Sequence, residues 1–187
     1  MRTQLLDAAQ SLVQRVGANA MSFQDLSDAV GIRKASVHHH FPTKSDLLLA
    51  LIERYADYFL GIVHKIAASR VSGLDQFRKY YGLFETTIAS WPGDKACPCG
   101  MLGAEIATLD EKPAARLREF YRANARVLGE MLEHGRADRS LKFDGTGESL
   151  AWVTFSHLEG AMLVARVEGG AKQFRAQCKQ FEKLIAA

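Results

Sequence analysis

Apolar side chains recur every three to four positions along almost the whole chain, and this spacing restricts its fold more than any other feature. Leu5, Ala9 and Val13 belong to an early series of this kind, and a later series includes Phe77 and Phe84. No segment shows the strict alternation of apolar and polar residues that marks a half-buried strand. The four prolines fall between the periodic segments, where they separate one helix from the next. We therefore predict an all-α protein.

The length and composition are those of an ordinary globular chain. Its 187 residues suffice for one good-sized domain or for two small ones that share a core. No apolar run approaches the roughly 18–20 residues that span a bilayer, and the first residues lack the apolar core and cleavage site of a signal peptide. We therefore expect a cytoplasmic protein with no membrane partner. The net charge of +3 permits a nucleic-acid partner without requiring one.

The first 60 residues carry the outline of a helix-turn-helix. Ser22 followed by Asp25 is a capping-box signal that begins a helix, and Gly31 can end it. A second short helix is expected over about residues 33–41, and Pro42 stops it. A short helix, a turn that contains glycine and another short helix form this motif, although a generic helical hairpin has similar spacing.

The stretch MSFQDLSDAVGIRKASVHHHFPTKSDLLLALIERY resembles the N-terminal DNA-binding domain of the TetR family of bacterial transcription regulators. The likeness covers roughly residues 2–60, and FSHLEGAMLVARVEGG and AKQFRAQCKQFEKLIAA are similar to the last two helices of that family. The resemblance implies an N-terminal three-helix DNA-binding domain, expected over residues 1–46. It also implies a C-terminal helical bundle over residues 47–187 for ligand binding and dimerisation.

What the resemblance implies about function follows from the same family. Members are mostly repressors, so we expect a homodimer that binds a palindromic operator in double-stranded DNA. A small apolar molecule is the expected inducer, and no cofactor is expected. The alternative function that also involves DNA is an architectural DNA-binding protein that responds to no signal.

The expected second helix of the motif carries the residues that would contact DNA. A short helix fits the major groove, where its first residues meet base edges, while neighbouring polar side chains contact phosphates. From Arg33 to Lys44 there are three bases and no acid, although a solvated basic turn has the same composition. The predicted DNA contacts are Arg33, Lys34, Ala35, Ser36, His38, His39 and Lys44.

Two positions depart from the family pattern. Arg33 stands where TetR-like proteins usually have a small N-capping residue, so the helix loses a cap worth about 1 kcal/mol and gains a cation near DNA. His38 stands where the family commonly has tyrosine, and a protonated histidine would strengthen a phosphate contact as the pH falls. A metal site at the three consecutive histidines, His38 to His40, is disfavoured because neighbours on a helix point about 100° apart. We therefore expect no metal.

An aromatic-rich series in the C-terminal part has two interpretations. Aromatic side chains at helical spacing usually form a core, whereas the resemblance favours an apolar cavity that binds a drug-sized ligand. The predicted pocket residues are Phe77, Tyr81, Phe84, Met101, Phe120, Trp152 and Phe155, with Glu105 and His157 as polar groups that orient the ligand.

The last two helices, expected over Ser149–Val167 and Ala171–Ile185, are predicted to form the dimer interface. Two copies would then form a four-helix interface. The alternative is that the same apolar series packs within one chain. The predicted interface residues are Leu158, Ala161, Met162, Ala165, Phe174, Cys178 and Phe181.

The segment Cys97-Pro98-Cys99 is unusual. Structural zinc sites take four ligands, usually with C-x-x-C spacing, and a disulfide across one proline is disfavoured by geometry and by a reducing cytoplasm. Either the segment only shapes a loop, or Cys97 and Cys99 sense oxidants or electrophiles and switch the repressor. A thiol near a helix N-terminus and near a cation such as Lys95 is more reactive. A thiol-dependent redox enzyme is the alternative from another functional class, although common catalytic sequence motifs are absent.

Overall fold

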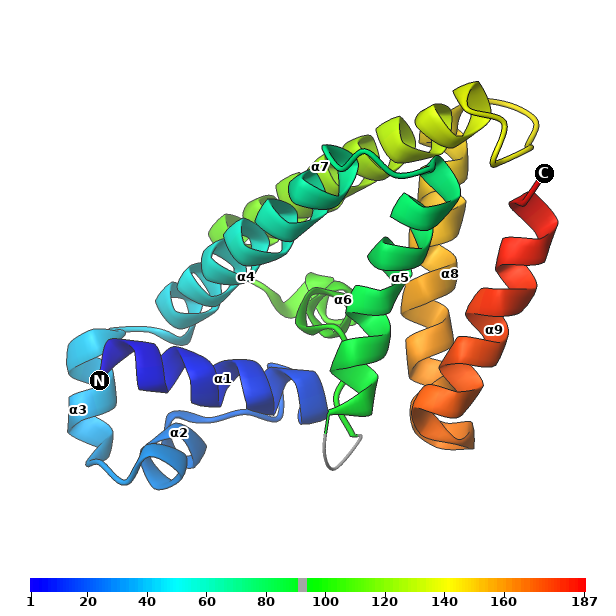
Figure 1. The fold of residues 1–187 in the computed structure, drawn as a ribbon. Coiled ribbons are helices and arrows are strands. Elements are labelled where there is room, and N and C mark those ends of the chain that lie inside the picture. The colour runs from blue at the N-terminus through cyan, green and yellow to red at the C-terminus, as the bar shows by residue number, and fades with distance from the viewer. Residues whose placement is uncertain (91–93) are drawn as a thin grey trace. The chain divides into compact units, whose positions relative to one another are not determined.

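The computed structural model describes residues 1–90 and 94–187, and the named elements in these residues are all helices, as predicted. Its elements are α1 (Arg2–Val16), α2 (Phe23–Val30), α3 (Lys34–His40), α4 (Lys44–Ala67), α5 (Gly73–Ala89), α6 (Pro98–Ala104), the short 3-10 helix η1 (Ile106–Thr108), α7 (Glu111–Ala137), α8 (Gly147–Glu168) and α9 (Gly170–Ile185), shown in Figure 1. Pro92 lies outside the described residues.

The chain forms two compact units. The first contains residues 1–57 and 96–120, and the second contains residues 58–95 and 121–187. Helices α4 and α7 therefore contribute residues to both units. The boundary predicted between residues 46 and 47 falls inside α4. None of the described helices is both long enough and apolar enough to cross a bilayer.

In the first unit, local sequence signals place α2 and α3. The Ser22 hydroxyl accepts the Asp25 N–H, and the Asp25 carboxylate accepts the Ser22 N–H at 2.7 Å, so the predicted capping box starts α2. Gly31 ends the helix in a left-handed conformation, with φ of 74°, which glycine adopts readily. The buried residues of this unit include Leu5, Ala9, Val13, Leu26, Val37, Phe41, Leu47 and Leu51.

In the second unit, α5, α8 and α9 pack against one another (Figure 1). Its buried residues include Phe77, Phe84 and Phe155, and the Tyr80 hydroxyl exchanges hydrogen bonds with the buried Asn124 amide at 2.8 and 3.1 Å. A Cβ on Gly73 would lie 2.1 Å from the backbone of Gly135, so glycine at that position allows the start of α5 to approach α7 closely.

Candidate DNA-binding surface and associated sites

Helix α3 turns one side inward and leaves the rest to solvent. Val37 is fully buried and Phe41, which ends the helix, is 1% exposed. These two side chains attach α3 to the core of the first unit. The predicted DNA contacts Arg33, Lys34, Ala35, Ser36, His38 and His39 are all exposed, and Lys44 is half-buried.

Arg33 occupies the N-cap position of α3, and its side chain makes no capping hydrogen bond. The backbone alone starts the helix, because the Ser36 N–H donates to the Arg33 carbonyl at 2.8 Å. The expected loss of a capping side chain is confirmed. The exposed guanidinium is therefore not engaged in capping its own helix.

Lys34, His38 and Lys44 line one shallow hollow of about 260 Å³, together with Phe23, Pro42 and Thr43. The His38 ring packs edge-on against Phe23, with 4.7 Å between ring centroids, and its Nδ1 lies 3.4 Å from the Pro42 carbonyl oxygen. Three of the seven predicted contacts, from the adjacent helices α3 and α4, thus meet at one place. No cluster of potential metal ligands occurs among the described residues.

An acid borders this surface. Hydrogen bonds from Ser22 hold the pKa of Asp25 below its usual range, and the charge of Lys44 lowers it further. Asp25 is therefore ionised at neutral pH, and its negative charge lies beside the basic face of α3.

The nine predicted pocket residues divide between the two units. Phe77, Phe84 and Phe155 lie in the second unit with exposures of 1–3%. Phe84 contacts Phe155 with 6.3 Å between ring centroids, and Tyr81 contacts Phe77 at 5.4 Å. These rings fill the interior of the unit, whereas Met101, Glu105 and Phe120 belong to the first unit.

His157 and Trp152 have different surroundings within the second unit. The His157 ring stacks on Phe181, with 4.7 Å between centroids, and burial lowers the pKa of the imidazole. Its Nε2 is buried without a hydrogen-bond partner among the described residues. Trp152 is 39% exposed and lines a groove instead.

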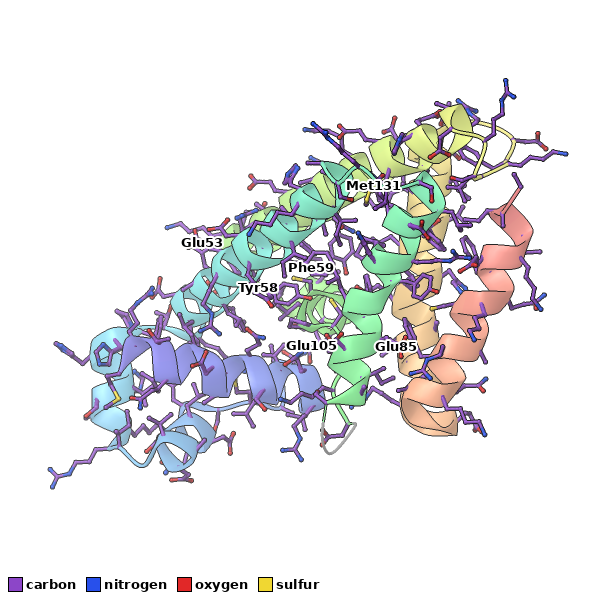
Figure 2. All side chains as sticks on the ribbon, in the orientation of Figure 1. Glu53, Tyr58, Phe59, Glu85, Glu105 and Met131 are labelled. Atoms are coloured by element: carbon purple, nitrogen blue, oxygen red, sulfur yellow. The ribbon has the colours of Figure 1, made fainter. Side chains whose placement is uncertain are left out.

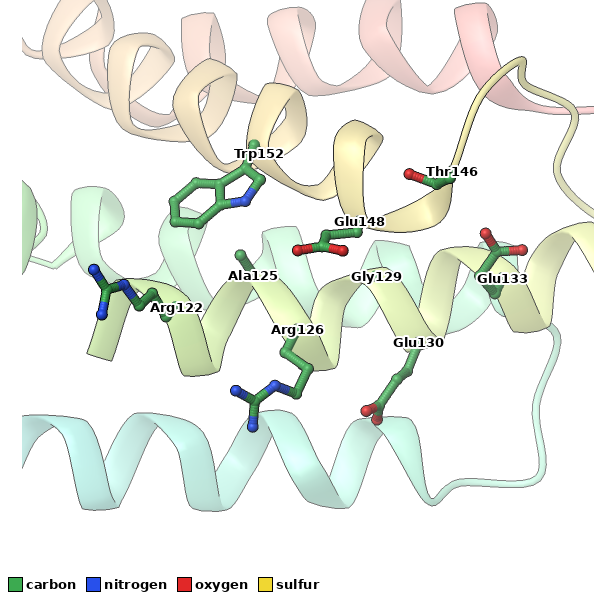
Figure 3. Close-up of a pocket in the computed structure, with 9 residues that line it drawn as sticks. All are labelled: Arg122, Ala125, Arg126, Gly129, Glu130, Glu133, Thr146, Glu148 and Trp152. Atoms are coloured by element: carbon green, nitrogen blue, oxygen red, sulfur yellow. The ribbon is translucent and has the colours of Figure 1, made fainter. Parts of the chain in front are cut away.

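That groove has a volume of about 680 Å³ and is formed by α7 and the start of α8. Its lining residues are Arg122, Ala125, Arg126, Gly129, Glu130, Glu133, Thr146, Glu148 and Trp152 (Figure 3). Figure 3 shows Arg122 and Trp152 toward one end and Glu133 toward the other. Trp152 was predicted to line a pocket, whereas the charged residues of α7 that line this groove have a spacing typical of a solvated helix face.

Glu105, predicted to orient a ligand, has another set of contacts. Its two carboxylate oxygens accept the backbone N–H groups of Ala18 and Asn19 at 2.7 and 3.1 Å. Both partners belong to the turn between α1 and α2. Since both oxygens are engaged there, the carboxylate is held against the α1–α2 turn within the first unit.

The residues predicted to form the dimer interface lie on the inner faces of α8 and α9. Leu158, Ala165, Phe174 and Cys178 are fully buried within the single chain, Met162 is 1% exposed, Ala161 is 5% exposed and Phe181 is half-buried. The structure therefore supports the alternative that this series packs within one chain. The exposed apolar residues of α8 include Val153, Leu163, Val164 and Val167, with exposures of 46–80%, beside the exposed Gly160.

Cys97, Cys99 and Cys178 are all buried, and no disulfide joins them in the part of the chain that the structure describes. Cys97 is 3% exposed and occupies the N-cap position of α6, and its Sγ lies 3.6 Å from the Tyr55 hydroxyl. Cys99 is 1% exposed. Burial, with a smaller contribution from the Glu85 charge, raises the pKa of Cys178 to about 12.

Comparisons with known proteins agree with this architecture. The family of bacterial regulatory proteins named after TetR matches residues 5–51. A TetR-family transcriptional regulator of known structure from Agrobacterium tumefaciens is 34% identical, covers 100% of this chain and 97% of its own, and superposes with a TM-score of 0.93. The transcriptional repressor NemR of Escherichia coli is 24% identical over 99% of this chain and 94% of its own length. The transcriptional regulator AcuR of Cereibacter sphaeroides is 26% identical over 88% of this chain and 75% of its own length.

The chain therefore belongs to the TetR family of bacterial transcription regulators. It is a transcription regulator and not an enzyme. The alternative function, a thiol-dependent redox enzyme, is therefore excluded.

Proposed function

We propose that this protein is a transcriptional repressor that binds a palindromic operator as a dimer, in the bacterial cytoplasm. The observation that carries the proposal is the exposed basic face of α3, a helix whose Val37 and terminal Phe41 are buried in the core. Arg33 and Lys34 stand at the start of this helix, where a helix in the major groove meets base edges. Lys44 and His38 flank it at a position suited to phosphates.

A second copy of the chain is the proposed partner for the open face of α8. Val153, Gly160 and Val167 are spaced seven residues apart and are all exposed, so they form one line along the helix. Leu163 and Val164 broaden this line into an apolar strip. In a twofold dimer the strips of both copies cover each other, and the two α3 helices can address half-sites one DNA turn apart, about 34–36 Å.

The proposed release signal is a small, largely apolar molecule bound in the second unit. Phe77, Phe84 and Phe155 pack together there, so a ligand that binds among them must move these rings apart. The buried Nε2 of His157 supplies a polar group that a ligand can satisfy, since it lacks a partner among the described residues.

Operator selection from random DNA followed by footprinting tests this function. We expect a protected palindrome that the dimer binds, and its release by at least one compound in a screen of small apolar molecules. If the protein selects no DNA sequence, the proposal is refuted. If no compound or oxidant affects operator binding, the protein is an architectural DNA-binding protein.

Modification of Cys97 is a second candidate for the signal. The thiol stands at the start of α6 and contacts the hydroxyl of Tyr55 in α4, so a bulky adduct on the sulfur must displace one of these helices. Burial of the thiol opposes rapid reaction. Operator release by an oxidant or electrophile should disappear in Cys97→Ser and persist in Cys178→Ser, whose thiol is also buried. Equal release from both variants contradicts this candidate.

A further inference from the structure

The side chain of Glu105 connects the end of α6 to the turn that follows α1 (Figure 2). Its Oε2 accepts the Ala18 N–H at 2.7 Å and its Oε1 accepts the Asn19 N–H at 3.1 Å. The two partners lie 87 and 86 residues earlier in the chain. A charged acceptor makes stronger hydrogen bonds than a neutral one, so this is a firm attachment.

The turn requires an acceptor at this place. The Gly17 N–H makes the closing bond of α1, to the Val13 carbonyl, and the chain then turns through a φ of 84° at Gly17. Ala18 is 1% exposed, so its N–H has no access to water and would be costly to leave unpaired. Successive N–H groups after such a residue form a concavity that suits an anion. The Glu105 carboxylate fills this concavity.

Gly17 is fitted to the carboxylate in shape as well. A Cβ at this residue would lie 2.5 Å from Oε1 of Glu105, which is closer than any real contact of that kind. The positive φ at Gly17 strains any other residue there, and an added methyl group would also displace the Glu105 carboxylate.

Two further hydrogen bonds attach the same segment to α1 and its turn. The Ala96 N–H donates to the Gln14 carbonyl at 3.0 Å. The Thr108 hydroxyl donates to the Asn19 side-chain oxygen at 3.1 Å. Residues 96–108 thus follow the last turn of α1 and the residues after it, with Glu105 at the centre of the contact.

The turn leads directly into the helix-turn-helix. Met21, 2% exposed, and the N-cap Ser22 follow it, and α2 then packs against α3. The conformation of residues 17–21 therefore sets the direction in which α2 and α3 leave α1. We propose that Glu105 is a positioning residue for operator recognition, which holds the α1–α2 turn in the conformation that presents α3 to DNA. This inference rests on the proposed operator binding.

Glu105→Gln tests the inference, because loss of the negative charge and loss of the turn's conformation have opposite effects on the affinity for DNA. Removing one acid from a DNA-binding unit favours binding to a polyanion. Positioning predicts the reverse, since the amide keeps one acceptor and turns an N–H₂ group toward a backbone donor. We expect Glu105→Gln to bind the selected operator about tenfold more weakly than wild type, while the protein stays folded and dimeric at the assay temperature. Glu111→Gln, which removes another acid from the same unit, should not weaken binding.

A salt series separates positioning from direct contact. Glu105→Gln should keep the wild-type dependence of affinity on salt, whereas loss of a phosphate contact in Lys44→Ala should reduce that slope by about one. A reduced slope in Glu105→Gln, or operator affinity equal to that of Glu111→Gln, overturns the inference. Failure of wild type to bind any operator overturns the proposed function and this inference with it.

A double-mutant cycle gives a second measurement. Gly17→Ala places a methyl group against Oε1 only while the carboxylate is present. We therefore expect Gly17→Ala to weaken operator binding less in a Glu105→Ala background than in wild type. Equal effects in both backgrounds contradict the inference.

Discussion

The exposed face of α8 offers the sharpest test of assembly. We predict that Leu163→Asp abolishes dimerisation at micromolar concentration while each chain remains folded. Leu163 is 47% exposed in the single chain, so the substitution leaves the core of the second unit intact.

The magnitude follows from the area that a partner would cover. Full burial of a leucine side chain contributes about 1.5–3 kcal/mol, and about half of Leu163 is still open in one chain. Covering that half contributes about 1 kcal/mol per copy, hence about 2 kcal/mol in a twofold dimer. The loss of this term alone raises the dissociation constant about 30-fold, and an aspartate forced into the interface adds the cost of desolvating its charge.

Sedimentation velocity over a dilution series measures the effect, and thermal melting checks the fold. Val16→Asp is a matched control, because Val16 is also an exposed aliphatic residue, 52% exposed, but lies on α1. This control should remain dimeric. Leu158→Ala should destabilise folding by about 2–5 kcal/mol, because Leu158 is fully buried within the chain. A Leu163→Asp protein that stays dimeric at wild-type concentrations refutes the assignment of this face.

Three further predictions concern DNA binding and stability. Arg33→Ala should weaken operator binding by about 1–3 kcal/mol, which fluorescence anisotropy measures, and wild-type affinity across a salt series would contradict the contact. Ser22→Ala should lower the free energy of unfolding by about 1 kcal/mol, since the Asp25 N–H loses its acceptor; an unchanged urea midpoint would show that the capping box is dispensable. Burial lowers the pKa of His157 in the folded state, so the unfolded chain binds more protons and stability should fall as the pH drops through the unfolded value of about 6.5. The melting temperature of His157→Phe should fall less than that of wild type over that pH range. An equal fall in both proteins would show that other groups cause the effect.

Local signals were sufficient to predict the DNA-binding end of the chain. The Ser22 capping box, the left-handed Gly31 and the exposed N-cap Arg33 depend on neighbours within a few residues, and each lies where the sequence placed it. Such features can be predicted because their geometry is set by short-range hydrogen bonds and backbone sterics.

In helix α8, the spacing of apolar residues does not predict which side of the helix faces the core of its own chain. Leu158 and Met162 face inward, while Val164 and Val167 face outward, so apolar residues occur on both sides of the helix. A hydrophobic series cannot indicate which side meets a partner and which meets its own chain when both sides are apolar.

Glu105 shows a second limit. Glu105 was predicted to orient a ligand because few charged residues occur among the apolar series around it, yet its partners are backbone N–H groups far away in the sequence. Every residue other than proline has the same backbone N–H group. The sequence therefore contains no pattern that would predict this contact.

The way α3 is attached has a consequence for how this protein can diversify. Folding depends on Val37 and Phe41, whereas Arg33 to Ser36 are exposed. If α3 contacts the operator as proposed, substitutions at these four positions should change the preferred DNA sequence at little expense in stability. A lineage that keeps the two anchoring side chains is free to acquire new target genes by altering a few exposed residues.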